Sequence, residues 1–536
     1  MERFFNTAGP QQPDIHYTID PLSRLDLDDV LMLIRQRKYF VLHAPRQTGK
    51  TSCMLALRDL LNREGDYIAV YANVEAGQAS RDNVKTVVKS IVDVLALSVS
   101  QIMKGSPLAS DIRDSAQDEG ADSMLSTYLA RLSEALGKPF VLIIDEIDAL
   151  VGDSLVSVLR QIRSGHANRP NHFPNTIILC GVRDVRDYRI QTSGKDIVTG
   201  GSAFNIKSES LRLGNFSPEE IHTLYMMHTE ETGQRFDETC FPMLWQATEG
   251  QPWLVNAVGY EVTMKMKENR DRSVVITPDM IDRAIENIIY RRDTHIDILI
   301  DKLREPRVKR VIEPILANSE EPDESKMSDE DIQYVKDMGL VVKETGKPMR
   351  ISNAIYREII PRELTASTQQ QLLLQPQWYQ REDGSIDMEK MMEAFQQFFR
   401  ENSDTWIGRF DYAEAGPQLL LQAFLQRIVN GGGYIDREYG LGRRRTDLLI
   451  RKPLGNPPGG KVQRIVMELK VKRMKDGMDT LVADGLRQTA EYMDTVGSVD
   501  EGHLIIFNRD GQLTWDERIW HRPMEYQGRP IMVWGM

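Results

Sequence analysis

Four short and almost wholly apolar runs, separated by segments with helical periodicity, constrain the fold of this chain most strongly. They are KYFVLHAP (38–45), DYIAVYANV (66–74), KPFVLIIDEID (138–148) and NTIILCGVRD (175–184). Strands that are apolar on both faces and alternate with helices are typical of a parallel sheet with helices on both sides. The first part of the chain is therefore expected to be an α/β domain.

The stretch APRQTGKT (44–51) joins the first run to the helical segment TSCMLALRDLLNREG (51–65). It fits the P-loop pattern, except that alanine stands where the first glycine is usual. The backbone N–H groups of such a loop bind phosphates, a lysine reaches the β- and γ-phosphates, and a threonine ligates magnesium. The alternative is a chance match, against which the preceding strand and the following helix argue. The predicted phosphate-binding residues are Pro45, Arg46, Gln47, Thr48, Gly49, Lys50 and Thr51.

Polar residues at the ends of two other apolar runs extend this prediction. Asp145 and Glu146 close the run FVLIIDEID, where an acidic pair can hold the magnesium shell and polarise an attacking water. Arg183 follows IILCGV at the place expected for a γ-phosphate sensor, although a surface arginine in the charged run RDVRDYR fits equally well. GQPW (250–253) is either the glycine–proline turn of an ATPase lid or an ordinary helix end.

Together these features resemble AAA-type ATPases, nearest to their signal-transducing branch, over residues 20–300. The resemblance implies ATP and Mg²⁺ as cofactors, slow or regulated hydrolysis, and assembly through the ATPase face into an ATP-dependent homo-oligomer. We expect the P-loop core at 1–215 and a helical lid at 216–300. The lid opens with SPEE, a serine N-cap followed by proline and acidic residues.

The middle of the chain is expected to connect two domains. Residues 301–365 hold helical patterns and the short runs LVVKE and PMRIS, which together suggest a winged-helix-like connector. The glutamine-rich stretch that follows is typical of a linker, placed at 366–384. The C-terminal domain is expected at 385–536.

The run RIVMELKVKR (464–473) alternates apolar and polar residues, which predicts a half-buried strand. TDLLI lies upstream, and the turn sequence GNPPGG between the two favours a hairpin. A hairpin symmetric about this turn sets Asp447 opposite Glu468, with the Cβ atoms about 4.5–5.5 Å apart. Two facing carboxylates are destabilising unless a divalent cation lies between them. The alternative is a solvated polar face with a one-residue bulge that separates the acids.

Three further residues add to this pattern. Gln488 and Tyr492 lie four residues apart in a helical segment and so share a face. Glu414, near the start of the helical segment EAGPQLLLQAFLQRIVNGGG, is either a third carboxylate or an ordinary acid of a first helical turn.

This order of residues resembles the PD-(D/E)xK nuclease superfamily over residues 385–536, with Thr446 standing where the superfamily's name has proline. The resemblance implies that Asp447 and Glu468 bind magnesium, and Glu414 is the candidate for a third carboxylate ligand. It further implies that Lys470 orients water or stabilises negative charge, and that Gln488 and Tyr492 lie on the following helix. The whole chain is similar to prokaryotic AAA-like ATPases fused to such domains, which act on nucleic acid in defence or mobile-element settings.

The composition of the chain limits the binding partners and the cellular compartment that we expect. A net charge of −12 argues against a chain coated in nucleic acid, but basic residues such as Arg443, Arg444 and Arg445 surround the hairpin and favour a local phosphate-binding cleft. Three widely spaced cysteines indicate free thiols in a reducing compartment. With no signal peptide and no apolar run of membrane-spanning length, we expect a cytoplasmic protein without a membrane partner.

The leading interpretation is an ATP-binding and ATP-hydrolysing protein coupled to Mg²⁺-dependent cleavage of nucleic acid, with DNA favoured as the partner. The alternative is a nucleotide-switched protein that binds nucleic acid or another protein through a nuclease-like domain that does not cut. A motor that translocates nucleic acid ranks last, because the sequence displays no pore loops.

Overall fold

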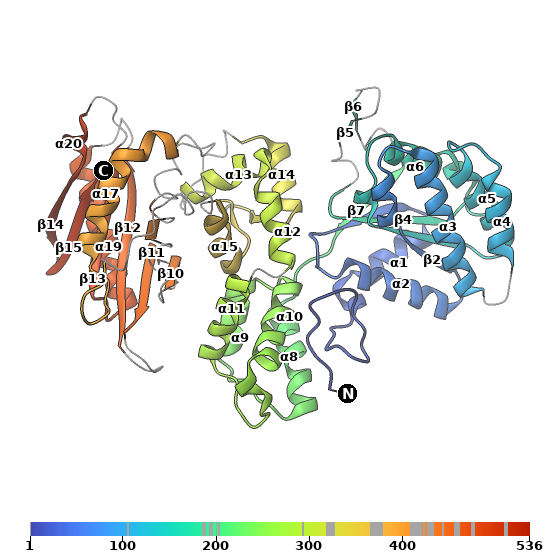
Figure 1. Cartoon of the computed structure of the whole chain (residues 1–536). Helices are drawn as coiled ribbons and strands as arrows, with labels where there is room; N and C mark the ends of the chain where they lie inside the picture. The colour runs from blue at the N-terminus through green and yellow to red at the C-terminus, as the bar shows by residue number, and fades with distance from the viewer. Residues whose placement is uncertain are drawn as a thin grey trace. The chain divides into compact units, whose positions relative to one another are not determined.

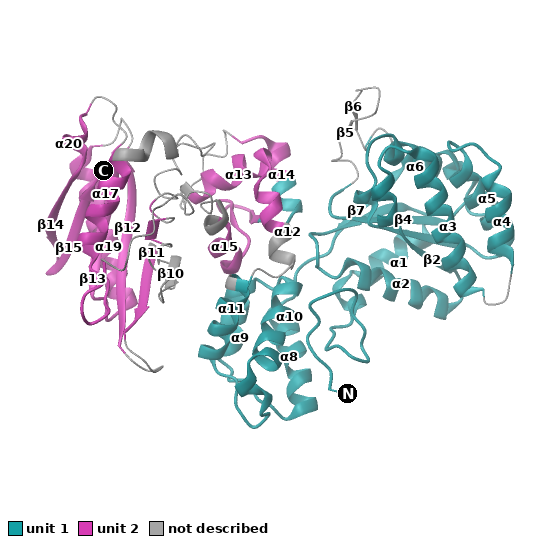
Figure 2. Ribbon diagram, viewed as in Figure 1, with its two compact units in different colours: residues 1–295, 334–340 teal, residues 296–333, 341–536 magenta. Residues whose placement is uncertain are grey.

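A computed structural model provides the structure of the chain, and its contacts divide the chain into two compact units. Unit 1 comprises residues 1–295 and 334–340, and unit 2 comprises residues 296–333 and 341–536 (Figure 2). The two units are described one at a time. The structure describes all residues except 1, 104–106, 185–188, 192–196, 200, 202–203, 292–293, 318–326, 365–378, 408–420, 422–423, 426–433, 442–443, 455–460, 473–476 and 509–512.

Unit 1 is built around a five-stranded sheet of order β2-β3-β4-β1-β7, in which all neighbouring strands are parallel (Figure 1). The four apolar runs form its first four strands, which confirms the predicted α/β fold. The sequence gives no signal for β7, because KSESLR is polar and an edge strand need not be apolar on both faces. The strands are β1 (Tyr39–His43), β2 (Ile68–Asn73), β3 (Phe140–Asp145), β4 (Thr176–Gly181) and β7 (Lys207–Arg212), with a small separate pair, β5 (Arg189–Gln191) and β6 (Ile197–Thr199).

Helices cover both faces of this sheet and form two apolar cores. On one face, α1 and α2 contribute Ile34 and Leu57. On the other face, α3 to α6 contribute Leu95, Leu129 and Leu159. Both layers are required because β3 is buried along its whole length. The helices are α1 (Leu27–Arg35), α2 (Lys50–Glu64), α3 (Val84–Ile102), α4 (Leu108–Gln117), α5 (Met124–Leu136) and α6 (Gly152–Ser164).

A set of helices follows β7 in unit 1. It opens at Ser217, whose hydroxyl accepts a hydrogen bond from the N–H of Glu220 while the Glu220 carboxylate accepts one from the N–H of Ser217. This capping box satisfies two N–H groups of the first turn and confirms the helix start predicted from SPEE. The helices are α8 (Pro218–Thr232), α9 (Cys240–Thr248), α10 (Pro252–Tyr260) and α11 (Pro278–Arg291).

Among the described residues, the segment from 294 to 364 holds four helices and one small hairpin. The runs LVVKE and PMRIS supply β8 and β9, which pair antiparallel. Helix α14 is divided between the units, since residues 334–340 belong to unit 1 while the residues on either side belong to unit 2. The elements are α12 (Thr294–Leu303), α13 (Pro306–Ala317), α14 (Asp329–Asp337), β8 (Val341–Val342), β9 (Arg350–Ile351) and α15 (Ala354–Leu364).

The rest of unit 2 is a six-stranded mixed sheet of order β10-β11-β12-β13-β15-β14. Strands β10 to β12 form an antiparallel series, and β13 pairs parallel with β12 after the intervening helix α19. Tyr379, inside the stretch expected to be a linker, is buried in the core of this unit. The elements are α17 (Met388–Ile407), β10 (Tyr434–Leu441), β11 (Arg444–Pro453), β12 (Val462–Lys472), α19 (Met478–Val496), β13 (Glu501–Asn508), α20 (Trp515–Arg518), β14 (Trp520–Tyr526) and β15 (Arg529–Gly535).

Strand β12 has the predicted alternation of faces, but both faces are covered between Ile465 and Leu469, so the prediction of a half-buried strand is wrong there. Ile465, Met467 and Leu469 pack in the core beneath α17, whereas Val466 packs in the core beneath α19. Because successive strand residues face opposite sides, Glu468 lies on the same face as Val466, toward α19. Among the described helices, none is both long and apolar enough to span a lipid bilayer.

Candidate functional site

The parallel sheet of unit 1 brings the predicted nucleotide residues to one edge. Strands β3, β4 and β1 are neighbours and parallel, so their carboxyl ends lie together. The loop 44–51 follows β1, Asp145 ends β3, and Arg183 follows β4 two residues past its end. Since β4 lies between β1 and β3 in the sheet, the segment that carries Arg183 lies in space between the loop and the acidic residues.

The conformation of the loop depends on Gly49 and on hydrogen bonds from Lys50. Gly49 has φ +91°, a conformation that favours glycine, and α2 begins at the next residue. Lys50 is buried, and its Nζ donates to the carbonyl oxygens of Ala44 and Pro45, both at 2.9 Å. A lysine beside the N-terminus of a 15-residue helix provides an anion-binding position.

Arg24, which no sequence pattern marks, supports the loop from outside. Its two terminal nitrogens donate to the carbonyl oxygens of Thr48 and Gly214, each at 2.5 Å, and its guanidinium stacks on Phe216 at 4.7 Å from the ring centre. A Cβ atom on Gly49 would lie 2.7 Å from Arg24 Nη1. The backbone conformation favours glycine there, and a larger residue would also displace the end of the Arg24 side chain.

Asp145 is the buried acid of the site, with no exposed surface. Its Oδ2 accepts hydrogen bonds from Thr51 Oγ1 at 2.7 Å and from Tyr71 Oη at 2.8 Å, and its Oδ1 accepts one from the N–H of Glu146 at 2.9 Å. A hydroxyl and a carboxylate this close fit the oxygen ligands that Mg²⁺ prefers. Tyr71 was not among the predicted residues, since a tyrosine in an apolar strand is ordinary core in any sequence.

Two other acids lie at this edge. Glu146 has φ +57°, which is uncommon for a residue with a side chain, and burial raises its pKa while Lys50 opposes the rise. Asp148 was not predicted; burial raises its pKa to about 6, and its Oδ2 accepts a hydrogen bond from the N–H of Val182. Asp148 thus fixes the backbone immediately before Arg183.

Arg183 is not a surface arginine. Its side chain is 12 % exposed, and its guanidinium lies 4.9 Å from the centre of the Tyr334 ring and 3.8 Å from the carboxylate of Asp337. It also lies close enough to Asp148 to lower the pKa of that carboxyl. The surface alternative raised by the sequence is therefore wrong.

A pocket adjoins the loop and is formed largely by parts of the chain that sequence reasoning left out. The stretch 6–19 is fixed over it by the indole N–H of Trp253, which donates to the carbonyl of Thr7 at 2.9 Å, and by Ser52 Oγ, which accepts from the N–H of Gln11 at 3.1 Å. In GQPW, Gln251 caps α10, and Pro252 and Trp253 line the pocket. Its assignment as the turn of an ATPase lid stays a prediction. The lining residues are Asn6, Thr7, Ala8, Gly9, Gln11, Tyr17, Thr18, Ile19, Pro21, Arg24, Gln47, Gly49, Ser52, Phe216, Leu224, Pro252, Trp253 and Asn256.

In unit 2, β12 and α19 bring together three of the predicted residues. Lys470 Nζ lies 2.9 Å from Glu468 Oε1 and 2.5 Å from Gln488 Oε1. Glu468 is only 3 % exposed, so the alternative of a solvated polar face is wrong for this residue. A buried carboxylate needs a cation or hydrogen-bond donors, and Lys470 supplies both here.

The hairpin register is the predicted one where the two strands are paired. Leu448 pairs with Met467, and the pairing runs without a bulge to Pro453 and Val462. The described pairing begins at Leu448 and Met467 and does not include Asp447 and Glu468, so their facing arrangement stays a prediction. The side chains of Asp447 and of the basic residues 443–445 lie outside the described residues, as does Glu414. Tyr492 lies on α19, partly buried against the core of this face.

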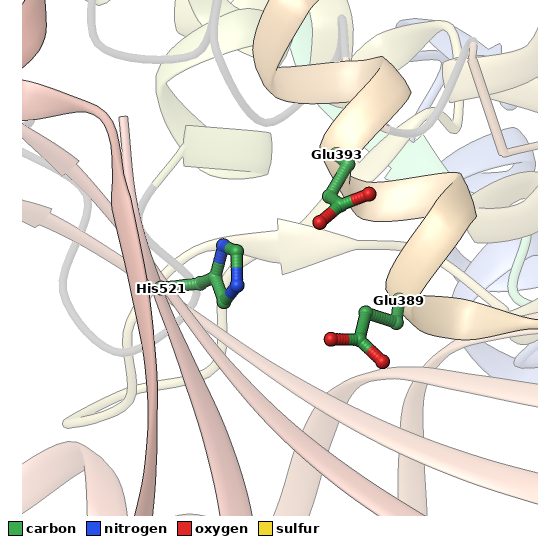
Figure 3. A group of neighbouring side chains, drawn as sticks. All are labelled: Glu389, Glu393 and His521. Carbon is green, nitrogen blue, oxygen red and sulfur yellow. The ribbon is translucent and has the colours of Figure 1, made fainter.

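A separate group of potential metal ligands lies elsewhere in unit 2 and gave no sequence signal. Glu389 and Glu393 are one turn apart on α17 and face His521 of β14 (Figure 3). One ligand atom from each lies within 4.8 Å of the other two. All three residues are exposed, so water screens their charges and the group does not require a cation. It has no part in the function proposed below.

A parallel sheet, a lysine-bearing loop before a helix, and a buried aspartate hydrogen-bonded to the threonine after that lysine define the class of P-loop ATPases. A family model described as an AAA-like domain matches residues 28–361. The chain belongs to this AAA-like family.

Comparison with solved structures gives distant similarities, and a search of curated proteins found no match. A Walker-type ATPase of Pyrococcus abyssi is 15 % identical, with a TM-score of 0.44 over 66 % of this chain and 99 % of that one. Cdc6p from Pyrobaculum aerophilum is 14 % identical, with a TM-score of 0.34 over 64 % and 93 %. The Thermotoga maritima RuvB Holliday junction branch migration motor is 12 % identical, with a TM-score of 0.32 over 62 % and 95 %.

Proposed function

We propose that this protein is an ATP-regulated, Mg²⁺-dependent nuclease, in which unit 1 binds and hydrolyses ATP and the C-terminal sheet of unit 2 cleaves nucleic acid. The observation that carries the proposal is the buried Glu468–Lys470–Gln488 group on one chain with a P-loop ATPase site. Residues 301–365 act as a winged-helix-like connector between them.

The ATPase part rests on residues whose chemistry matches their proposed roles. Lys50 and the N–H groups at the start of α2 bind the phosphates, and Thr51 with Asp145 holds Mg²⁺, which neutralises charge on the phosphates. Glu146 orients the attacking water, and its raised pKa is consistent with a carboxylate kept out of bulk water. Arg183 contacts the terminal phosphate. The pocket beside the loop, capped by Trp253, accepts the base.

The nuclease part rests on an acidic pair and a lysine held by a sheet. Asp447 and Glu468 would hold Mg²⁺, and a hard cation suits two carboxylates. Lys470 lies on the same face and stabilises negative charge that develops on the cleaved phosphate. Gln488 positions the amine of Lys470 from α19. Glu414 is proposed as a further ligand and Tyr492 as a further residue of this helix face.

Phosphodiester cleavage of DNA and RNA in the presence of Mg²⁺ and ATP tests the proposal. Wild type is compared with Glu468→Gln, Asp447→Asn and Lys50→Ala, with Glu525→Gln on the exposed β14 as a matched control in the same sheet. We expect product from wild type and the control, none from the two acid variants, and loss of the ATP response in Lys50→Ala. Equal cleavage by wild type and Asp447→Asn would refute the nuclease assignment.

One observation favours a second candidate, a nucleotide-switched protein that binds nucleic acid without cutting it. The Lys470 ammonium lies 2.9 Å from Glu468 Oε1, so the negative charge of this carboxylate is compensated without a metal. Tight binding of DNA with no product in Mg²⁺ or Mn²⁺ would support this candidate. Measurement of molecular mass with and without ATP tests the proposed ATP-dependent homo-oligomer in either case.

A further inference from the structure

The strands of the unit 1 sheet begin at the edge opposite the phosphate loop, and part of this edge is strongly basic. Helix α1 ends just before β1, and α6 leads through a loop to β4, so both segments reach the place where these two neighbouring parallel strands begin. We call residues 35–38 and 160–172 the basic edge. It contains no aspartate or glutamate, and its basic residues are Arg35, Arg37, Lys38, Arg160, Arg163, His166, Arg169 and His172.

The acidic residues of the same elements lie at their other ends. Residues 30–58 and 154–183 contain no aspartate or glutamate. Asp29 lies in the first turn of α1 and Asp153 in the first turn of α6, whereas the basic residues lie in and after the last turns. A chain with a net charge of −12 therefore gathers positive charge at this one edge of its first sheet.

Arg169 joins the two segments of the basic edge. Its Nε donates to the carbonyl oxygen of His166 at 2.7 Å, its Nη1 donates to the carbonyl oxygen of Arg37, and its guanidinium lies 4.8 Å from the centre of the Tyr39 ring. Tyr39 Oη in turn donates to the carbonyl oxygen of Pro174 at 3.0 Å. Burial lowers the pKa of Arg169, and the nearby charge of Arg37 adds to this effect. The two segments are thus fixed to each other with their positive charges close together.

The other charges of the basic edge are not compensated by carboxylates. Arg35, Lys38 and Arg160 are exposed and form no ion pair within the part of the chain that the structure describes. Glu134, near the end of α5, reaches this edge but lies 2.6 Å from His172. Repulsion among the remaining cations therefore destabilises the free protein.

Helix dipoles account for only part of this charge. Arg35 and Arg163 lie in the last turns of α1 and α6, where the negative end of a helix dipole favours cations. Arg37, Lys38 and Arg169 lie outside both helices. A partner with closely spaced negative charges would offset the repulsion among all of them.

We propose that the basic edge binds the phosphate backbone of duplex nucleic acid. Guanidinium groups bind phosphate oxygens through paired hydrogen bonds, and the exposed amides of Gln36, Asn168 and Asn171 add further donors. The basic edge contains no Phe, Tyr or Trp, and the neighbouring Tyr39 and Phe173 are buried, so the bases of a single strand find no aromatic surface to stack on. The inference rests on the proposed function for the identity of the polyanion. It assigns to unit 1 the binding of the polymer that unit 2 is proposed to cut.

Fluorescence anisotropy of labelled duplex DNA and duplex RNA tests the inference on the full chain, in EDTA so that no metal-dependent cleavage occurs. A triple variant with Arg35→Gln, Lys38→Gln and Arg160→Gln should bind both duplexes about tenfold more weakly at physiological salt. Its plot of log affinity against log salt should be less steep by about 2–3, because each lost phosphate contact removes about 0.9 from the slope. These three side chains make no hydrogen bond within the described part of the chain, so the variant should fold as wild type does.

The matched control removes the same charge from exposed positions elsewhere in unit 1, through Lys85→Gln, Lys89→Gln and Lys267→Gln, and should bind both duplexes as wild type does. ATP affinity should be equal in both triple variants and wild type, because the basic edge and the phosphate loop lie at opposite ends of the strands. A further readout needs no variant. Bound duplex should protect Lys38, but not Lys85, from chemical acetylation.

Equal duplex binding by the two triple variants, or acetylation of Lys38 that bound duplex does not change, would overturn the inference. Tighter binding of single strands than of duplexes would overturn it too, as would binding of wild type to phosphatidylserine vesicles but to neither duplex. A wild-type chain that binds the duplexes but cleaves neither of them in Mg²⁺ and ATP would refute the nuclease assignment and leave this inference standing.

Discussion

Asp148 should make the ATPase unit less stable as the pH rises. Burial raises the pKa of this carboxyl from 3.8 to about 6, against opposing effects of a backbone hydrogen bond and of Lys50. Its Oδ1 is buried and has no hydrogen-bond partner among the described residues. The folded state therefore holds a proton that the unfolded chain has lost, and stability from this group falls as the pH rises from 3.8 through 6.

The size of the effect follows from the same two values. The rise in pKa corresponds to a loss of about 3 kcal/mol once the pH is well above 6, and to about half of that at pH 5. Asp148→Asn removes the titration and keeps an oxygen that can accept from Val182. The difference in unfolding free energy between the variant and wild type should therefore grow by about 1–2 kcal/mol between pH 5 and pH 8.

Hydrogen exchange of the buried strands β3 and β4, corrected for intrinsic rates, measures this free energy for unit 1 within the intact chain. Asp66→Asn, at an exposed position before β2, is the control and should follow wild type at every pH. An offset between Asp148→Asn and wild type that is already present at pH 5 reflects different packing of the amide, and only its growth with pH measures the titration. A difference that does not change from pH 5 to pH 8 would refute the reasoning.

Three other predictions concern the ATPase unit. Gly250→Ala should lower the melting temperature far more than Gly233→Ala. Both residues have positive φ, but a Cβ at 250 would lie 2.0 Å from a backbone carbonyl oxygen, whereas the space at 233 is open. Similar decreases in melting temperature for the two variants would contradict this. Trp253→Phe should weaken nucleotide binding about tenfold, since it removes the hydrogen bond that fixes the N-terminal stretch over the pocket, and unchanged affinity by titration would exclude that role. Tyr71→Phe should lower the kcat of ATP hydrolysis several-fold with little change in KM, because one hydrogen-bond donor that orients Asp145 is lost. A kcat equal to that of wild type would show that Thr51 alone orients Asp145.

Local patterns in the sequence were sufficient for four of the five strands of the first sheet and for the loop. Strands β1 to β4 follow from runs that are apolar on both faces, and Gly49 and Lys50 follow from the loop pattern at the start of a helix. The register of β11 and β12 followed from the symmetry of the GNPPGG turn, because a hairpin turn fixes which residues face each other. The roles assigned to the side chains at both sites stay predictions.

Residues brought in from a distance could not be found in this way. Arg24 reaches the loop from a segment before α1. Asp148 is one of three acidic residues in a short run, and the sequence does not indicate that its carboxyl is buried. The contact of Asp337 with Arg183 joins residues more than 150 positions apart, so no spacing or periodicity reports it. Strand β7 could not be predicted either, because its sequence is polar and only its parallel pairing with the distant β1 makes it a strand.

The path of the chain through its two units has a consequence for how the gene can be divided. The polypeptide leaves the first unit after residue 295, returns for seven residues and leaves again, so no single break yields both units whole. A truncated product that stops near residue 300 would retain the loop around Lys50 but lack the piece that covers its edge. Fragments made by recombination or proteolysis would therefore differ in behaviour from the same sequences in the intact chain.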